Sequence, residues 1–234
     1  MKHLLILLIA KCCLLNLMAQ QKIDYPETRK DEVEDDYFGT IVKDPYRWLE
    51  DDYSAETMEW VELQNKTTEK YLSEIPFRKV IHRQLEELWS YATQGIPSHY
   101  DNFTIYSKND GKHNHSVYYI LGKESDQAEV LIDPNKLSAD VSVAVKFLSV
   151  SKDEKYMAYG LSKSGSDWTE IHVMELASKK LLKDHIKWVK FSGVSWFKNG
   201  FYYSGYTPPA KGSEFAAKNE FNKVYYHQLE TTQE

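Results

Sequence analysis

The chain has 234 residues, a formal net charge of −6 at pH 7 and 42% apolar residues, among them 17 tyrosines and 6 tryptophans. The acidic balance argues against nucleic acid or an anionic membrane as the main partner, because either would favour clustered lysine and arginine. The apolar and aromatic content is ample for a packed core and excludes an intrinsically disordered chain.

Residues 1–19 have the pattern of a secretory signal peptide. A lysine and a histidine follow Met1, an apolar run extends from Leu4 to Ala10, and Ala19 supplies a small residue for cleavage. Lys11 interrupts the apolar stretch, which makes it a poor transmembrane helix, since about 20 apolar residues in succession are needed to span a bilayer. We expect cleavage after Ala19, export to the periplasm or the extracellular space, and no membrane attachment of the mature chain.

The cysteines leave a second interpretation of this segment open. Cys12 and Cys13 are the two cysteines of the chain, so the mature protein has neither disulfides nor thiol chemistry. Acylation of one of them would make the protein a lipoprotein, although Lys11 stands where a small residue would be expected.

Two polar stretches precede the first expected helix. We interpret the acidic run 31–36 as a solvated loop and not as a metal site, because consecutive carboxylates point in diverging directions. Asp44-Pro45 predicts a turn that leads into a capped helix. Within the following residues, Arg47 can stack on a ring or pair with a carboxylate such as Glu50 or Asp51.

Residues 53–94 have helical periodicity and predict two helices. Ser54 can cap the first helix, and Pro76 is tolerated in the first turn of the second. Gly95 and Pro97 end the second helix. Its apolar residues recur at 3.6-residue spacing and predict one core-facing stripe. They are Val80, Ile81, Leu85, Leu88 and Trp89.

After Gly95 short β-prone runs alternate with turn residues, as in an all-β domain. Equivalent positions recur: 53 residues separate Tyr118 from Ile171, and 53 separate Ile171 from Val224. Repeats of about 40 to 50 residues with several strands each are typical of β-propeller blades. The predicted strands are Phe103–Ser107, Ser116–Leu121, Val130–Ile132, Tyr156–Leu161, Ile171–Leu176, Phe201–Tyr206 and Lys223–Leu229.

We therefore predict about three blades, too few to close a ring. Propellers use about four to eight blades, and an incomplete one exposes strand edges and apolar faces. We expect the natural gene product to continue beyond Glu234.

Several motifs, in order along the chain, resemble the prolyl oligopeptidase family of serine peptidases. They run from residue 25 to about residue 227. The motifs are Tyr25-Pro26-Glu27-Thr28, Tyr37-Phe38-Gly39, Asp44-Pro45-Tyr46-Arg47-Trp48-Leu49-Glu50-Asp51, Ile75-Pro76-Phe77-Arg78, Asp133-Pro134-Asn135, Ser164-Gly165-Ser166-Asp167-Trp168 and Val189-Lys190-Phe191-Ser192-Gly193-Val194-Ser195-Trp196.

The resemblance implies a mainly β fold with an N-terminal α-helical segment. In the family, a segment like 20–94 packs with an α/β-hydrolase catalytic domain, and a seven-bladed propeller is inserted after it. Residues 95–234 would then be the first blades, about three of seven, and the catalytic domain would be missing from this chain.

No complete serine-peptidase site is present in the sequence. Such a site of the hydrolase type needs Gly-x-Ser-x-Gly with a histidine base and a carboxylate. Gly193-Val194-Ser195-Trp196 lacks the second glycine, and Ser164-Gly165-Ser166 has the wrong order. We expect no catalytic residue in this chain, and the resemblance implies that the triad lies in a C-terminal part.

The histidines do not predict a metal site. His113 and His115 flank Asn114 beside a glycine turn, and because no third ligand lies at metal spacing, we interpret them as surface-loop residues. The other histidines after residue 19 are isolated in sequence, and we predict neither a metal nor a cofactor. They are His82, His99, His172, His185 and His227.

The resemblance assigns two substrate-binding residues. In the family the peptide lies between propeller and catalytic domain, and Phe191 matches a phenylalanine that forms an apolar wall for residues upstream of the substrate proline. Asp167 matches an aspartate near the domain interface, where it could pair with an arginine of the catalytic domain. A core position for Phe191 and a turn cap for Asp167 stay open as alternatives.

The resemblance implies that the complete gene product is an exported, monomeric prolyl oligopeptidase. It would hydrolyse proline-containing oligopeptides on the carboxyl side of proline by acyl transfer, with a propeller that excludes folded proteins. This chain alone is expected to be inactive. Three alternatives stay open: an oligopeptidase B that cleaves after arginine or lysine, a non-catalytic propeller that binds a peptide or glycan, and a short interaction protein.

Overall fold

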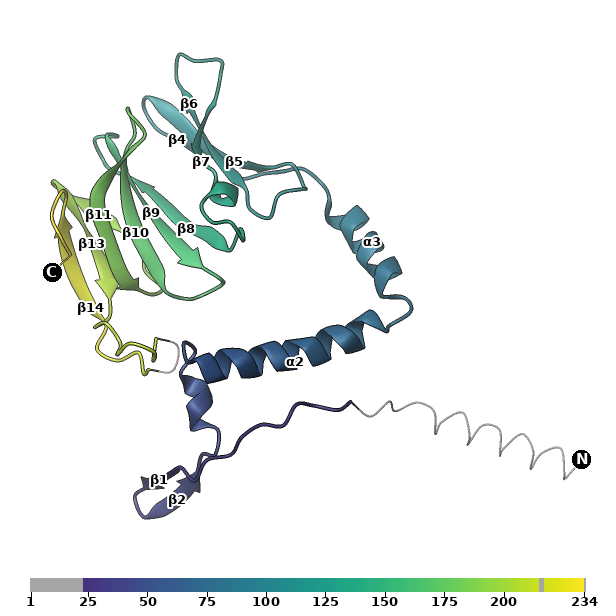
Figure 1. Ribbon diagram of the computed structural model, residues 1–234. Helices are drawn as coiled ribbons and strands as arrows, with labels where there is room; N and C mark the ends of the chain where they lie inside the picture. Colours follow the sequence, from purple (N-terminus) through teal and green to yellow (C-terminus); the bar gives the residue numbers. More distant parts are fainter. Residues whose placement is uncertain (1–22, 215–216, 234) are drawn as a thin grey trace, which may run out of the picture. The chain divides into compact units, whose positions relative to one another are not determined.

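The computed structural model describes residues 23–214 and 217–233 (Figure 1). The expected signal peptide at residues 1–19 lies outside the described residues. The chain divides into two compact units. The first contains the described residues up to His82 and residues 210–214, and the second contains residues 83–209 and 217–233.

The first unit contains a β-hairpin that corrects the interpretation of the acidic run as a loop. Strand β1 (Glu34–Tyr37) pairs antiparallel with β2 (Thr40–Lys43). Phe38 and Gly39 between them have φ of 56° and 90°, and positive φ at both central residues is what a two-residue hairpin turn requires. Backbone pairing with β2 therefore orders the acidic stretch, while its carboxylates remain at the surface.

The segment after the hairpin forms the predicted turn, and the short helical turn that follows it has no side-chain cap. A 3₁₀ turn, η1 (Arg47–Glu50), follows Asp44-Pro45. Arg47 pairs mainly with Asp44, at 2.5 Å from Nε to Oδ2, and with Asp35 across the hairpin, while Glu50 lies farther away at 3.8 Å. The hydrogen bonds that the Arg47 guanidinium donates to the carboxylates of Asp44 and Asp35 raise its pKa. Arg47 thus pairs with carboxylates as predicted, but its main partners are residues other than Glu50 and Asp51.

Both predicted helices are present. The first, α2 (Ala55–Ser73), begins at Ser54, whose Oγ accepts a hydrogen bond from the Thr57 backbone N–H at 3.1 Å, which satisfies one of the free donors of the first turn. The second is α3 (Arg78–Trp89). Its apolar stripe is exposed, with Trp89 71% accessible, and so does not face a core in this structure. In the described part of the chain, no helix is both long and apolar enough to cross a membrane.

The second unit is built from three antiparallel sheets, each a meander of successive strands. Sheet one is ordered β3-β5-β6-β7, and β4 also pairs with β5. Its β3 includes residues that the sequence placed in the helical segment 20–94. The strands of sheet one are β3 (Thr93–Gln94), β4 (Ser98–His99), β5 (Phe103–Asn109), β6 (Val117–Gly122) and β7 (Glu129–Ile132).

Sheets two and three follow in chain order after a short 3₁₀ turn, η2 (Pro134–Lys136). Sheet two is ordered β11-β10-β9-β8 and sheet three β12-β13-β14. Their strands are β8 (Val143–Val150), β9 (Tyr156–Lys163), β10 (Thr169–Glu175), β11 (Lys180–Val189), β12 (Ser195–Phe197), β13 (Gly200–Gly205) and β14 (Lys223–Gln228).

Two hydrophobic clusters join the three sheets, and sheet two contributes to both. The first cluster combines Phe103 and Ile105 of sheet one with Met157, Tyr159 and other residues of sheet two. The second combines Ala158, Ile171, Val173 and Ile186 of sheet two with Phe201 and Tyr203 of sheet three. Neighbouring residues of β9 thus enter different clusters, because successive side chains of a strand point to opposite faces. Sheet two is therefore buried on both faces, as a propeller blade is.

Candidate functional site

The two residues assigned by resemblance lie at one pocket. Asp167, in the turn between β9 and β10, and Phe191, two residues after β11, line a cavity of about 270 Å³. A second hollow of about 390 Å³ shares Phe191 and extends along β12 and β13. The residues that line the first cavity are Lys146, Phe147, Asp167, Thr169, Phe191, Ser192 and Gly193.

Phe191 is presented to solvent. Its side chain is 84% exposed, so the alternative of a core aromatic is wrong for this structure. The backbone of Phe191 is in the left-handed region with φ of 51°, a conformation that costs a bulky residue about 1 kcal/mol or more. The Ser192 hydroxyl fixes the next residue, since it accepts a hydrogen bond from the Ser204 backbone N–H at 3.0 Å.

Asp167 has an exposed side chain, and no hydrogen bond or ion pair to its carboxylate is found among residues 23–214 and 217–233. The neighbouring Ser166 caps the turn instead, because its Oγ accepts from the Trp168 N–H at 3.1 Å. Trp168 anchors the turn by edge-to-face contacts with Trp188 and Tyr206, and the Lys190 ammonium lies 4.1 Å from its ring centroid. The carboxylate of Asp167 is thus held at the pocket and is available to a cation.

The site combines an apolar wall with a carboxylate, which is suited to binding and not to covalent chemistry. His113, His185 and His227 lie beside carboxylates, and not beside serine hydroxyls. The nearest approach to a catalytic dyad is His227, whose Nε2 lies 2.6 Å from Asp184 Oδ1. Both side chains are buried between sheets two and three, so no substrate reaches them.

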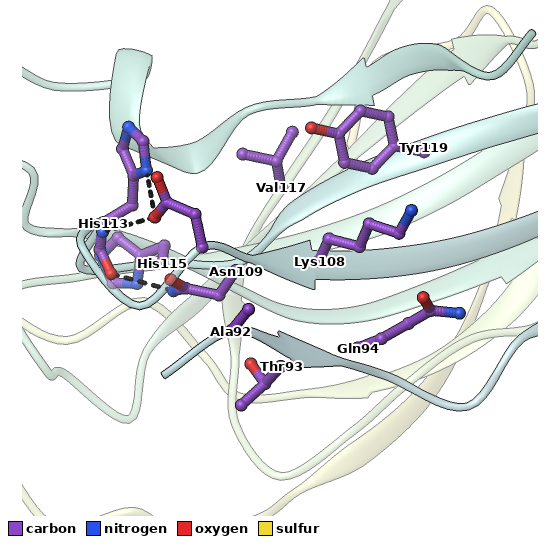
Figure 2. A pocket seen from close by; sticks show the side chains of 10 residues that line it. Ala92, Thr93, Gln94, Lys108, Asn109, His113, His115, Val117 and Tyr119 are labelled. Carbon is purple, nitrogen blue, oxygen red and sulfur yellow. Dashed lines mark hydrogen bonds and ion pairs between the residues drawn. The ribbon is translucent and has the colours of Figure 1, made fainter. Parts of the chain in front are cut away.

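Another cavity, of about 440 Å³, lies on sheet one and contains the histidine loop (Figure 2). His113 is exposed and lies 2.8 Å from Asp110, whereas His115 lies with Nε2 2.9 Å from the Val141 carbonyl oxygen. The Lys112 N–H and His113 lower the pKa of Asp110. The two histidines have separate partners, in agreement with their interpretation as loop residues.

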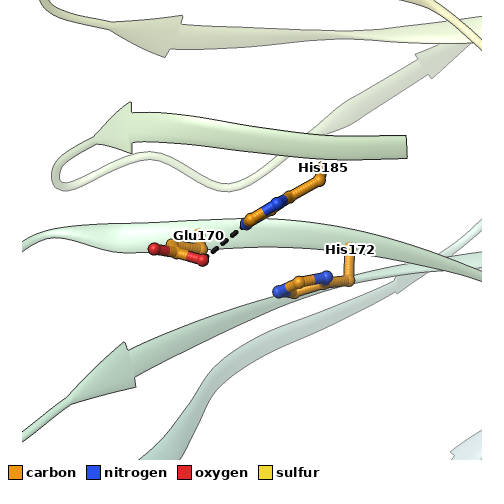
Figure 3. Close-up of side chains that lie close together, drawn as sticks. All are labelled: Glu170, His172 and His185. Carbon is orange, nitrogen blue, oxygen red and sulfur yellow. Dashed lines mark hydrogen bonds and ion pairs between the residues drawn. The ribbon is translucent and has the colours of Figure 1, made fainter. Parts of the chain in front are cut away.

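Sheet two brings three further residues together. Sequence spacing treated two of them, His172 and His185, as isolated and did not single out Glu170. Glu170, His172 and His185 place their ligand atoms within 4.8 Å of one another (Figure 3). The sequence signal is Glu170-x-His172, a same-face pair on a strand, but the partner His185 could be found only from the pairing of β10 with β11. The two histidines are isolated in sequence, as stated, but strand pairing places them side by side.

Three antiparallel meanders in succession, joined by two hydrophobic clusters, are the architecture of β-propeller blades. The family model described as "Prolyl oligopeptidase, N-terminal beta-propeller domain" matches residues 25–234. The chain belongs to the prolyl oligopeptidase family, as its motifs predicted, and the predicted fold class is confirmed.

Curated relatives agree with this assignment. The prolyl endopeptidases of Elizabethkingia meningoseptica and Elizabethkingia miricola are each 41% identical over 212 residues, which cover 90% of this chain and 30% of theirs. The prolyl endopeptidase of Dictyostelium discoideum is 29% identical over 261 residues, 89% of this chain and 34% of that protein. The chain thus spans about a third of the length of the relatives it matches and corresponds to their N-terminal portion.

Solved structures resemble the chain in the same way. A structure from a study of two prolyl endopeptidases and their inter-domain dynamics has a TM-score of 0.74 at 29% identity and covers 89% of this chain and 31% of its own. Prolyl oligopeptidase B from Galerina marginata, bound to a 35-residue substrate, has a TM-score of 0.69 at 27% identity and covers 92% of this chain and 33% of its own.

Proposed function

We propose that the protein that carries this chain is a prolyl oligopeptidase, a serine endopeptidase that hydrolyses oligopeptides on the carboxyl side of proline. The observation that carries the proposal is the match of residues 25–234 to the family's N-terminal propeller, together with 41% identity to prolyl endopeptidases. The chain contributes the N-terminal helical segment and the first blades. A C-terminal α/β-hydrolase domain contributes the serine, histidine and carboxylate.

In this proposal the propeller binds and selects while the hydrolase domain performs acyl transfer. The serine, activated by histidine, attacks the carbonyl after proline, an oxyanion hole stabilises the tetrahedral intermediate, and water releases the acyl-enzyme. A closed ring of blades admits oligopeptides and excludes folded proteins by size. The complete enzyme acts as a monomer, and this chain alone has no turnover.

The test uses the full-length protein and chromogenic peptides. Cleavage after Gly-Pro, with none after arginine or lysine, is the expected result. Cleavage after arginine or lysine instead would assign the protein to the oligopeptidase B branch, and binding of peptide without any cleavage would assign a propeller binding module.

Phe191 forms the apolar wall for substrate residues upstream of proline. Its exposure at the cavity supports this role. Phe191→Ala should raise KM about tenfold for peptides that extend upstream of Gly-Pro, since loss of an apolar contact is worth about 1–3 kcal/mol, and leave a minimal Gly-Pro substrate unchanged. Phe221→Ala is the matched control, because Phe221 is also exposed, at 79%, and also has positive φ, at 58°. Equal effects of both variants would contradict the role.

Asp167 pairs with an arginine of the hydrolase domain. Its unpartnered, exposed carboxylate at the cavity supports this assignment. Asp167→Asn should lower kcat/KM about fivefold, which corresponds to the ~1 kcal/mol of an ion pair at a surface, and the difference should shrink at high salt. The control is Asp126→Asn, at an exposed aspartate in the turn between β6 and β7. An Asp167→Asn enzyme that behaves like the control would remove the ion pair from the proposal.

The signal-peptide pattern of residues 1–19 supports export of the protein. The mature protein should begin at Gln20, which mass spectrometry of the secreted product measures. A product acylated at Cys12 or Cys13 would instead establish the lipoprotein alternative.

A further inference from the structure

Sheet two carries a cluster of metal-binding side chains that peptide hydrolysis does not use. His172 on β10 is the register partner of His185 on β11, and directly opposed residues of an antiparallel pair have Cβ atoms about 4.5–5.5 Å apart. Glu170 lies two residues before His172 and therefore on the same face of β10. Figure 3 shows the three side chains next to one another, with His185 joined to Glu170 and the His172 ring beside them, and their ligand atoms lie within 4.8 Å of one another.

Irregularities of β11 hold this arrangement in place. The pairing register shifts between Thr169 and Ile171 and again between His172 and Met174, so bulges lie on both sides of the short paired stretch. Bulges re-aim side chains at an edge. Ile171 and Ile186 inside this stretch are fully buried in the second hydrophobic cluster. Because side chains alternate, the two histidines are fixed on the opposite face.

One part of the cluster is exposed to solvent, and the other part packs against a buried side chain. His172 is half-buried, and its ring stacks on that of the buried Tyr159, with centroids 5.7 Å apart. The His172 and His185 rings are stacked at 4.6 Å and 17°. Glu170 and His185 are exposed, and His185 Nε2 lies 2.5 Å from Glu170 Oε2. Ions from solution can therefore reach the cluster from the side of Glu170 and His185, and water can fill the remaining coordination positions.

We propose that Glu170, His172 and His185 bind a divalent transition-metal ion of the Zn²⁺ class. Two imidazoles and one carboxylate are a donor set that zinc, copper and nickel prefer and that calcium and magnesium do not. Metal–ligand bonds of about 2.0–2.1 Å place tetrahedral ligand atoms about 3.3 Å apart, so side-chain rotations close the present separations. The bound ion links the edge strand β11 to β10 and stabilises sheet two.

Isothermal titration of the untagged full-length protein with ZnCl₂ tests the site. We expect one saturable site, and a rise in the melting temperature on addition of Zn²⁺ but not of Mg²⁺. His185→Gln and Glu170→Gln are the deciding variants, because both residues are exposed and their replacement leaves the core intact. Each should weaken Zn²⁺ binding at least about tenfold, because loss of even an outer-shell partner costs about 10–100-fold in metal affinity and these residues are direct ligands.

The matched control is His113→Gln, which removes a histidine that also lies beside a carboxylate but has no third donor. This variant should bind Zn²⁺ and gain thermal stability like the unchanged protein. Electron paramagnetic resonance of the Cu²⁺ form supplies a second readout, with two nitrogen ligands expected and one in His185→Gln. Zn²⁺ affinity that is the same in His185→Gln as in the unchanged protein, or lost equally in His113→Gln, would overturn the proposal.

Discussion

The carboxylate of Asp184 is a buried polar link between sheets two and three. Oδ1 accepts hydrogen bonds from His227 Nε2 at 2.6 Å and from the Glu230 N–H at 2.8 Å. Oδ2 is buried and has no partner. A buried polar pair of this kind contributes little net stability, yet removing one member leaves its partners unsatisfied.

We therefore expect Asp184→Ala to destabilise the protein by about 3 kcal/mol, because His227 and the Glu230 N–H would lose their acceptor inside the packed sheets. Urea unfolding measures the change. Asp126→Ala, at an exposed site, should change stability by no more than about 0.5 kcal/mol. Comparable losses in the two variants would show that the buried pair does not hold the sheets together.

The phenol of Tyr159 makes the free energy of unfolding depend on pH in the alkaline range. Burial raises the pKa of its phenol to about 12, against about 10 in an unfolded chain. As pH rises through 10 the unfolded chain therefore loses its proton first, so stability is fully present below pH 10 and declines between about 10 and 12. Burial also raises the pKa of Tyr118, Tyr203 and Tyr100, which act in the same direction.

Tyr159→Phe should make this alkaline decline shallower by at most about 1.4 kcal/mol per pH unit, the value for one proton. Urea midpoints measured over a series of alkaline pH values provide the slope. Tyr25→Phe, at an exposed tyrosine, controls for loss of a phenol as such. An unchanged slope in Tyr159→Phe would mean that the buried phenol does not titrate on unfolding.

At the scale of single residues, sequence motifs identify residues that act locally. They carry no information about residues that come together only through the pairing of two strands. Phe191 and Asp167 are 24 positions apart in the chain, and family motifs singled out both before the structure placed them at one cavity. Glu170, His172 and His185 meet through the register of β10 and β11, which two bulges shift. Side-chain periodicity carries no information about such shifts, so the cluster was not predicted.

Among the elements, helices were predicted more completely than strands. A cap at Ser54 and a 3.6-residue stripe after Pro76 are local signals, and α2 and α3 follow them. Strand β11 was not predicted because lysines and an aspartate interrupt its apolar residues, and only packing on both faces of sheet two explains it as a strand. Strand β1 differs from the predicted loop for a similar reason, since its acidic residues conceal a hairpin that Phe38 and Gly39 close.

Strand β13 begins at Gly200, where the backbone of β14 approaches closely. A Cβ at this position would meet the carbonyl oxygen of His227 well inside van der Waals contact, and would also crowd the Tyr226 ring. The carbonyl belongs to a paired strand and cannot move away without breaking the ladder.

Gly200→Ala should therefore cost about 2 kcal/mol, as overpacking in a closed site does, and thermal unfolding measures the loss. Gly193→Ala is the matched control, because no atom lies within 4 Å of its added Cβ. If Gly200→Ala melts at the same temperature as Gly193→Ala, the close approach of the two strands is not a constraint on β13.

For the molecule as a whole, the recurrence of equivalent positions at 53-residue intervals was enough to predict blades, because each blade repeats one meander. The 53-residue period does not predict how the sheets stack, since stacking depends on which face of each strand is apolar. Sheet two is apolar on both faces, so its neighbours on either side are required for its burial. Sheet three shares only one face with sheet two.

The other face of sheet three is aromatic and open. Tyr202 and Tyr226 are register partners with ring centroids 5.0 Å apart, and Phe197 packs beside Tyr202. Val224, 73% exposed, extends the same face. Their neighbours in sequence, Phe201, Tyr203 and Tyr225, pack into the second hydrophobic cluster. A contiguous apolar sheet face of this kind is an association surface in water, and in the proposed full-length enzyme a further blade covers it.

The chain expressed by itself should therefore self-associate, and its apparent mass in sedimentation velocity should rise with concentration, whereas the full-length protein should stay monomeric. Val224→Lys should weaken the association of the isolated chain at least about tenfold, because a lysine in the middle of an apolar contact must be desolvated. Leu181→Lys, at an exposed apolar position of sheet two, should leave it unchanged. If the isolated chain is monomeric at every concentration, or if both variants associate alike, the open face of sheet three does not need a further blade to cover it.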